Sequence, residues 1–368
     1  MTAKSRQLPI DALKVIAAQF IVLHHLSAYG PVADTLRQSA PVLMGWLYDY
    51  ARMAVQIFLV IGGYLAAASL APGGKPKHHH SPLQAVLKRY RRLVLPCLVA
   101  LLLAVASAAL ARQWLNDDFI PTAPTWAQSV AHVFLLQGVL DKEALTAGVW
   151  YVAIDFQLFV LMTLLVWLGQ RQHRTASADP AIGPGLAQIL VLGLVVSLML
   201  ASLFFFNRDP TWDNWAIYFF GAYGMGAAAF WAGGSRRPAL YLGVLAITGG
   251  LALALEFRER IVLALGIALL LGLWHWGRTI NPSSFSRRRE SSPATSLVLT
   301  RLVHQLGQSS YALFLVHFPV LMLGNALFAK LGLSSPVAAA WVMLACWTTS
   351  LAMAQAFERW VEAPLARY

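Results

Sequence analysis

The stretch IDALKVIAAQFIVLHHLSAY, residues 10–29, decides the class of fold. It is long enough to cross a bilayer as one helix, because the hydrocarbon core needs about 20 predominantly apolar residues. Asp11, Lys14 and His25 nevertheless lie within it. An ionisable side chain costs about 2.5–3.5 kcal/mol at the centre of a span, and such residues usually mark a functional site. The stretch therefore predicts a membrane helix with one polar face.

Helical geometry places the polar groups of this stretch. Lys14 and His25 are eleven residues apart, which is about three turns, so they share a face. Asp11 lies three positions before Lys14, close enough to neutralise its charge. His24 points about 100° away from His25, so we expect it at the interface or beside the site. A structural ion pair with interfacial histidines is the alternative interpretation of this face.

The rest of the chain has the same apolar character. Of its 368 residues, 58% are hydrophobic and 12% are charged, about half the charged share of a soluble domain. The sequence predicts a single all-α integral-membrane domain over residues 1–368, a polytopic helical bundle of about ten transmembrane helices. The expected spans lie near 10–29, 44–71, 93–111, 149–169, 185–206, 215–232, 238–255, 261–276, 303–328 and 336–357.

The basic residues indicate how these helices are oriented. The net charge of +12 does not indicate a nucleic-acid site, because Lys and Arg fall in alternate loops rather than in one patch. With the N-terminus in the cytoplasm, 19 of the 28 basic residues lie on the cytoplasmic side. This bias follows the positive-inside rule, so both termini are predicted to be cytoplasmic.

Several other segments yield expectations. The first apolar stretch is expected not to be a cleaved signal, because it contains charges and no small-residue cleavage site follows it. Cys97 and Cys346 fall in expected spans, so each is expected to be a small core residue without a disulfide. The triplet His78-His79-His80 is expected to be a solvated loop cluster, and no metal site is predicted.

Two loops stand out by length and composition. The outer loop 112–148 contains Trp114 and Trp126 among acidic residues, which suits either an interfacial helix or a substrate-facing cap. Residues 281–300 are rich in Ser and Arg and are expected to form a flexible cytoplasmic linker. There is no internal repeat, which weakens the case for a transporter built from inverted halves.

Polar residues also occur in the other expected spans, as a shared interior cavity requires. A glycine pair, Gly62-Gly63, would let backbones or a ligand approach closely there. The basic run 88–92 precedes the third span. It is either ordinary inside-loop charge or a site for an anionic ligand such as a nucleotide diphosphate, for which arginine offers bidentate geometry. The polar residues are Arg52 and Gln56 in the second span, Trp150, Asp155 and Gln157 in the fourth, and Ser310 and His317 in the ninth.

Six short motifs follow one another along these helices. They are Lys14-x10-His25; Arg52 to Tyr64, ending Gly62-Gly63-Tyr64; Arg89-Tyr-Arg-Arg92 followed by Pro96; Trp150-Tyr-Val-Ala-Ile-Asp155-Phe-Gln157; Ser310-Tyr311-Ala-Leu-Phe-Leu-Val-His317-Phe-Pro319; and Glu362-Ala-Pro364. In this order they resemble the acyltransferase-3 family of integral-membrane acyltransferases, which O-acetylate bacterial polysaccharides and related glycans. The chain is similar to the short form of the family, without an appended periplasmic domain.

The resemblance implies an enzyme of the bacterial inner membrane that uses acetyl-CoA as a donor substrate and has no permanently bound cofactor. The acceptor would be a hydroxyl of a cell-envelope glycan, of exopolysaccharide or O-antigen type and possibly lipid-linked. Polysaccharide-assembly proteins would be its partners. The catalytic residues would be His25, as general base or acetyl carrier, with Asp155, Lys14 and Asp11; the CoA-binding residues Arg89, Arg92 and Arg52; and the acceptor-binding residues Trp150, Gln157, Ser310, Tyr311 and His317.

The chain departs from the family pattern at three positions. Gly62 stands where serine is common, Asp155 where glutamate is common, and Lys14 where arginine is common. Lysine does not offer the bidentate contact of arginine, which puts such a contact at position 14 in doubt.

Two rival functions remain open at this point. A transporter or flippase for a glycan or lipid intermediate would move its substrate without acetyl-CoA. A non-catalytic component that binds a glycan-assembly partner would tolerate loss of Arg89, Arg92 and His25 together. The sequence leaves open which acceptor glycan and hydroxyl are used, and whether the acyl group is acetyl or another short acyl group.

Overall fold

The computed structural model describes residues 8–75, 81–176, 185–280 and 294–366. In these ranges the chain forms helices and turns and contains no strand. Nine of the described helical segments are long and apolar enough to cross a membrane. The prediction of an all-α, polytopic membrane fold is therefore confirmed. The expected span 215–232 is the helix α9, Ala216–Gly233, which is not among these nine.

The chain divides into two compact units, and each is discontinuous in sequence. The first unit comprises residues 1–55, 90–153 and 295–368, and the second comprises 56–89 and 154–294. Two of the boundaries fall inside the long helices α5, Pro82–Ala111, and α7, Val149–Ala176. A single domain over the whole chain stays a prediction.

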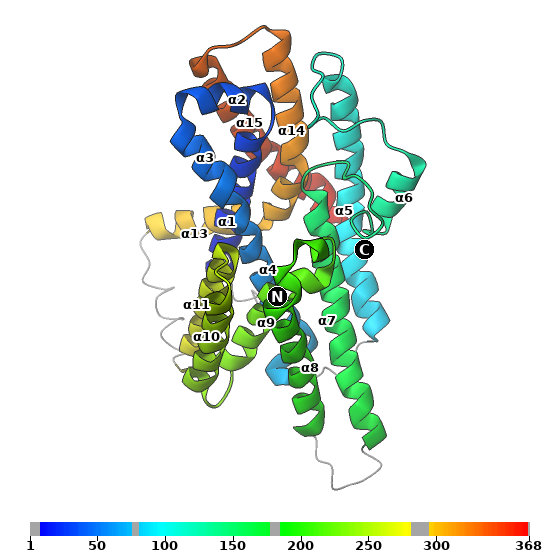
Figure 1. Cartoon of the computed structure of the whole chain (residues 1–368), viewed down its shortest axis with the longest axis vertical. Helices are drawn as coiled ribbons and strands as arrows, with labels where there is room; N and C mark the ends of the chain where they lie inside the picture. Colours follow the sequence, from blue (N-terminus) through cyan, green and yellow to red (C-terminus); the bar gives the residue numbers. More distant parts are fainter. Residues whose placement is uncertain (1–7, 76–80, 177–184, 281–293, 367–368) are drawn as a thin grey trace. The chain divides into compact units, whose positions relative to one another are not determined.

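In the first unit, α14 packs against both α1 and α15 (Figure 1). Most of α14 is buried, which agrees with its apolar sequence on every side. The helices of this unit, besides the parts of α5 and α7, are α1 Leu8–Ala28, α2 Gly30–Ser39, α3 Pro41–Tyr50, the 3₁₀ turn η1 Ala51–Ala54, α6 Trp126–Val133, α13 Ala294–Gln308, α14 Ser310–Lys330, α15 Pro336–Phe357, the π-helical turn Glu358–Glu362 and α16 Ala363–Leu365.

In the second unit, α9 contacts α8, α10 and α11 and forms the core (Figure 1). A Cβ atom at Gly63 would overlap the backbone carbonyl of Tyr223, and one at Gly226 would overlap that of Val60. Glycine thus lets the α4 and α9 backbones touch, as expected for Gly63. Besides α7 and α9, this unit contains α4 Val55–Leu70, η2 Pro72–Gly74, α8 Gly185–Phe204, η3 Phe206–Arg208, η4 Pro210–Trp212, α10 Pro238–Leu255 and α11 Glu259–Ile280.

Three local features differ from the sequence expectation. Residues 30–43, expected as a loop, form α2 and the start of α3, because Pro31 and Pro41 each occupy the first turn of a short helix. The expected span 303–328 is split at Ser309, where α13 ends. Of the expected linker, residues 294–300 form the start of α13, while 281–293 lie outside the described residues, as do residues 76–80 with the histidine triplet.

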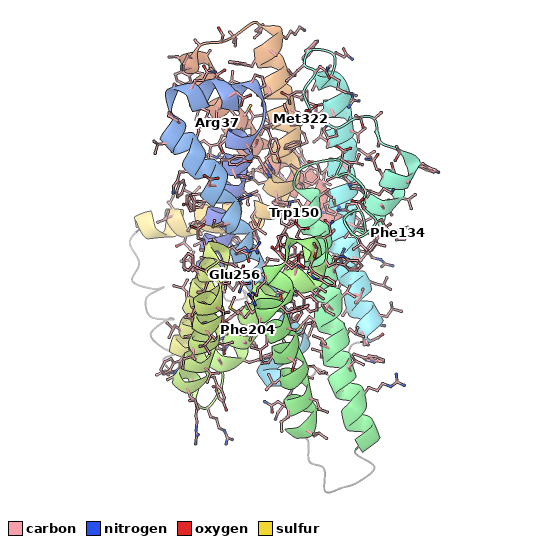
Figure 2. All side chains as sticks on the ribbon, viewed as in Figure 1. Arg37, Phe134, Trp150, Phe204, Glu256 and Met322 are labelled. Atoms are coloured by element: carbon pink, nitrogen blue, oxygen red, sulfur yellow. The ribbon has the colours of Figure 1, made fainter. Side chains whose placement is uncertain are left out.

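The loop 112–148, predicted to be an outer loop, contains the short helix α6, whose first turn is held by a capping box between Thr125 and Gln128. Its exposed side is apolar, with Trp126 at 85%, Val130 at 46% and Phe134 at 57% exposure, and Figure 2 marks Phe134. Its buried side carries the polar Gln128 and His132. An apolar stripe turned outward suits a lipid interface better than water, which favours the interfacial interpretation over a cap.

The loop behind α6 is held by a neutral histidine. His132 donates from Nδ1–H to the Gln128 carbonyl at 2.7 Å and accepts the Leu145 backbone N–H at Nε2, at 3.2 Å. Burial lowers the pKa of His132 below its ordinary value. The unfolded loop therefore binds more protons than the folded loop, so the stabilisation is complete above about pH 6.5 and is lost as the pH falls.

We therefore expect hydrogen exchange in residues 126–148 to accelerate as the pH falls below about 6.5, after correction for the intrinsic pH dependence of exchange. A His132→Gln variant, which does not titrate, should show a flat corrected profile. An equally steep acid transition in that variant would show that another group controls the loop.

Candidate active site

Two of the predicted site residues meet in the first unit. His25 Nδ1 of α1 lies 2.6 Å from His317 Nε2 of α14. The ring centroids are 4.9 Å apart and the ring planes differ by 2°. Both side chains are buried, with 7% and 1% exposure. The sequence placed both histidines on polar helix faces, and the structure joins them.

The partners of these rings decide which nitrogens carry protons. His317 Nδ1 lies 2.9 Å from the Leu313 carbonyl oxygen, which can only accept, so Nδ1 carries the proton. In a neutral ring, Nε2 of His317 then accepts, and His25 donates to it from Nδ1–H. Nε2 of His25 is left with a free lone pair, and it has no hydrogen-bond partner among the described residues. The pair thus presents one nitrogen lone pair that can accept a proton.

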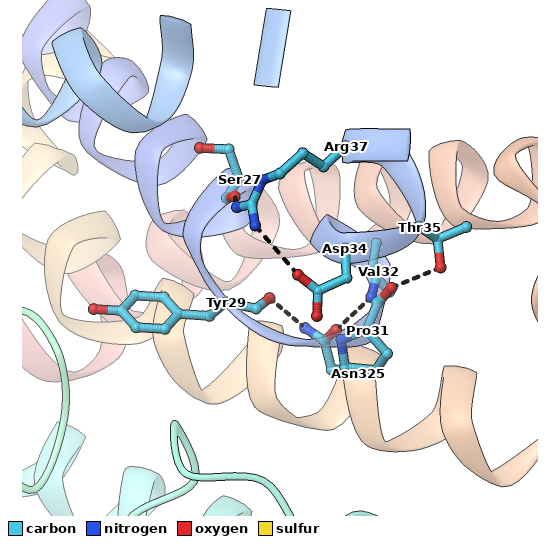
Figure 3. A network of polar contacts seen from close by, with 8 residues as sticks. All are labelled: Ser27, Tyr29, Pro31, Val32, Asp34, Thr35, Arg37 and Asn325. Atoms are coloured by element: carbon cyan, nitrogen blue, oxygen red, sulfur yellow. Dashed lines mark hydrogen bonds and ion pairs between the residues drawn. The ribbon is translucent and has the colours of Figure 1, made fainter. Parts of the chain in front are cut away.

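The turn between α1 and α2 holds the C-terminal end of the His25 helix (Figure 3). The Asn325 side chain of α14 accepts the Val32 backbone N–H at 3.0 Å and donates to the carbonyls of Tyr29, at 3.5 Å, and Leu321, at 3.1 Å. Arg37 donates to the Ser27 carbonyl at 2.9 Å. Because Asn325 and His317 are both on α14, one helix fixes both the histidine and the turn that follows it.

Gly30 is required for this turn. Its φ is +83°, a conformation in which other residues are strained. A Cβ atom there would also lie 2.6 Å from Asn325 Cγ and 2.9 Å from Phe119 Cε1. We expect Gly30→Ala to lower the free energy of unfolding by roughly 1–3 kcal/mol, measured by thermal unfolding of the purified protein. Gly45→Ala in α3, where a Cβ meets nothing within 4 Å, is the control, and an equal effect of the two changes would contradict this role.

The N-terminal part of α1 contacts other charged groups. Asp11 Oδ2 lies 2.9 Å from Nδ1 of His304 in α13, a partner that the sequence did not indicate. Glu362, from the last motif, interacts electrostatically with Arg92 and Lys14. Residues of three motifs, on α1, α5 and the π-helical turn, are therefore neighbours in the first unit. Lys14 and Arg92 are the predicted basic residues of this group.

The second unit contains a second group of predicted residues. Arg89 Nη2 of α5 donates to Asp155 Oδ2 of α7 at 2.5 Å. The Asp155 side chain is 8% exposed and that of Arg89 is 29% exposed. The guanidinium also lies over the Phe159 ring, 5.4 Å from its centroid. A Cβ at Gly62 would lie 3.3 Å from Asp155 Oδ1, so the glycine leaves room beside the carboxylate.

The remaining predicted residues differ in exposure and in hydrogen-bond partners. Arg52 is exposed in η1, and its Nε donates to the Asp49 carbonyl. Ser310 and Tyr311 make structural contacts, since Ser310 donates to the Gly307 carbonyl and the Tyr311 phenol donates to the Leu93 carbonyl. Trp150 is 38% exposed, and Figure 2 marks its position. Gln157 is half-buried on α7.

Sequence reasoning missed Asn325, His304 and Tyr29. Asn325 carried a usable signal, because an asparagine within an apolar span needs a partner. His304 carried little signal, because it lies at the start of an expected span, where polar residues are ordinary. Tyr29 was treated as the end of the first span. Its ring lies 5.7 Å from that of His25.

Comparison with known proteins gives one result. The family model described as an acyltransferase domain, of the acyltransferase-3 type, matches residues 8–355 of the 368. The match begins at the first residue of α1 and ends within α15. It therefore includes the histidine pair, the Arg89–Asp155 pair and Lys14. No curated protein and no solved structure matches the chain.

Proposed function

Because the chain belongs to the acyltransferase-3 family and is a multi-pass membrane acyltransferase, we propose that it transfers an acetyl group from acetyl-CoA to a hydroxyl of a cell-envelope glycan. The acceptor is of exopolysaccharide or O-antigen type, free or lipid-linked. The enzyme acts in the bacterial inner membrane with both termini in the cytoplasm, so acetyl-CoA arrives from the cytoplasmic side. The bias of Lys and Arg between alternate loops supports this orientation.

The observation that carries the proposal is the hydrogen-bond chain from His25 through His317 to the Leu313 carbonyl. As general base, His25 Nε2 takes the proton of the acceptor hydroxyl while the hydroxyl oxygen attacks the thioester carbonyl. The carbon–sulfur bond then breaks, and CoA leaves as a thiolate that takes up a proton. The same nitrogen would carry the acetyl group if transfer proceeded in two steps.

The other predicted residues serve the two substrates. Lys14 and Arg92 provide positive charge for the CoA phosphates. Both interact electrostatically with Glu362, which supports their belonging to one group. Asp155 holds Arg89 by a direct ion pair, which fixes a planar group that suits a phosphate. Arg52, exposed in η1, is a further candidate for the donor, and Trp150 and Gln157 are candidates for the acceptor.

Replacing His317 tests the hydrogen-bond chain. We expect His317→Leu to slow acetyl transfer because the His25 Nδ1–H loses its acceptor, a penalty of about 1–3 kcal/mol, which is roughly 5- to 150-fold in rate. His317→Gln, whose side-chain oxygen can accept, should recover part of the rate. The measurement is transfer of radioactive acetyl from acetyl-CoA to the glycan fraction of membrane vesicles.

If His317 has only a structural role, the activities and pH–rate profiles of the two variants should differ from this expectation. Both variants would then lose activity in proportion to folded protein, with an unchanged pH–rate profile. If His317 acts on His25, folded His317→Leu protein has a shifted profile, because His25 loses the partner that sets its basicity.

A further inference from the structure

Three aromatic side chains form a connected group in the first unit, two of them in ring contact with His25, and none is among the predicted site residues. The ring centroid of Tyr29 lies 5.7 Å from that of His25 and 6.0 Å from that of Phe119. Phe318 stands edge-on to the other rings, 5.4 Å from Tyr29, 6.1 Å from His25 and 6.3 Å from Phe119. We call Tyr29, Phe119 and Phe318 the aromatic cluster.

The backbone around the cluster is anchored. Asn325 accepts and donates hydrogen bonds on both sides of Gly30, and the Tyr29 ring extends away from this network (Figure 3). The missing side chain of Gly30 leaves the space that Phe119 occupies against the turn. On the loop that carries Phe119, the Asp117 carboxylate accepts the Phe119 backbone N–H at 3.3 Å. The rings are thus held in place before a ligand arrives.

The phenol of Tyr29 differs from those of Tyr90 and Tyr311 in the same unit. Tyr90 and Tyr311 donate to the carbonyls of Val133 and Leu93, each at 2.7 Å. The Tyr29 hydroxyl has no hydrogen-bond partner in the part of the chain that the structure describes. Burial raises its pKa, so the hydroxyl keeps its proton and can both donate and accept. A tyrosine hydroxyl usually finds a hydrogen-bond partner when it is buried, and a ligand that covers Tyr29 can supply one.

Exposure separates the cluster from ordinary core packing. Phe318 is 3% exposed, whereas Tyr29 and Phe119 are half-buried. The cluster therefore presents aromatic surface and one hydroxyl next to a histidine with a free lone pair. An aromatic ring face is electron-rich and attracts the weakly positive C–H groups of a sugar ring. Binding sites commonly combine such apolar surface with a few polar groups that fix orientation.

We propose that the aromatic cluster is the acceptor subsite, in which a sugar ring packs its C–H face on Tyr29 and Phe119. The Tyr29 hydroxyl bonds one sugar hydroxyl, and a neighbouring hydroxyl faces Nε2 of His25. This assignment rests on the proposed function for the class of acceptor. Tyr29 and Phe119 lie outside the six motifs, so the subsite can differ between members of the family and select the glycan.

Saturation-transfer NMR on the whole protein in nanodiscs tests binding without requiring a reaction. The probes are methyl glycosides of glucose, galactose, mannose and N-acetylglucosamine in one mixture. We expect transfer to the ring C–H protons of at least one glycoside, affinity about tenfold weaker for Phe119→Ala, and a loss of about three- to tenfold for Tyr29→Phe, the size of one hydrogen bond. Phe134→Ala, exposed at the end of α6, is the matched control and should bind like the natural protein.

The outcomes separate this inference from the proposed function. Sugar binding that depends on Tyr29 and Phe119 but is never followed by acetyl transfer would overturn the enzyme and keep the subsite. Acetyl transfer with an unchanged acceptor KM in Tyr29→Phe and Phe119→Leu would overturn the subsite and keep the enzyme. Absence of saturation transfer to all four glycosides would also overturn the subsite. Phe119→Leu removes the flat ring but keeps most of the apolar volume. A loss of binding in this variant can therefore be assigned to the ring rather than to misfolding.

Discussion

Replacing His25 by alanine is expected to lower acetyl transfer by about 10²–10⁴-fold or more, the range for loss of a general base. His25 is the residue whose Nε2 the hydrogen-bond chain leaves free to accept a proton. The rate of labelled acetyl transfer in vesicles, normalised to folded protein, measures the effect.

The matched control for this prediction is the adjacent histidine. His24 lies on the same helix, with its ring 5.2 Å from that of His25 and 5.8 Å from that of Tyr48. His24→Ala should retain most of the activity, because His24 does not belong to the His25–His317 pair. Similar losses in both variants would indicate a packing defect of α1, and near-natural transfer by folded His25→Ala would remove His25 from the mechanism.

Replacing Arg89 by leucine is expected to lower the free energy of unfolding by about 3 kcal/mol, near the low end of the cost of breaking a buried ion pair. The Asp155 carboxylate is 8% exposed and would lose its guanidinium. The value stays at the low end because Arg89 is 29% exposed and already partly solvated. Thermal unfolding in detergent measures the change. Arg91→Leu, which removes an exposed arginine of the same helix, is the control.

A double variant separates stability from function at this pair. Arg89→Leu with Asp155→Leu should be close to the natural protein in stability, because an apolar pair can replace a buried ion pair at little cost. If Arg89 binds CoA phosphates, the double variant stays weak in donor binding although it is stable. Full acetyl transfer at natural acetyl-CoA concentrations by the double variant would show that the pair is structural only.

The sequence predicts the membrane fold well, because a long apolar run that crosses a bilayer satisfies its backbone hydrogen bonds by forming a helix. It predicts the short helices poorly. Pro31 and Pro41 indicate a turn as readily as a helix start, and the α2–α3 corner depends on packing between α2, α3 and α1. The break at Ser309 follows serine, glycine and glutamine residues whose local preference is weak.

For the site, the sequence indicates single residues but not pairs. His25 and His317 were each predicted, yet 292 positions separate them, and their contact depends on how α1 packs on α14. The same holds for Asp11, predicted to neutralise Lys14 and found to contact His304. The sequence did not indicate the aromatic cluster, because single aromatic residues are common in apolar segments. The three rings come from separate segments and form one surface only after folding.

The most direct test of acetyl transfer through His25 is mass spectrometry of the surface glycans from cells that express the natural protein, the His25→Ala variant or no protein. We expect acetylated sugar units with the natural protein, and none with the folded, membrane-inserted variant or without the protein. The same spectra name the sugar and the hydroxyl. Equal acetylation in cells with the natural protein and with the His25→Ala variant would contradict a catalytic role of His25.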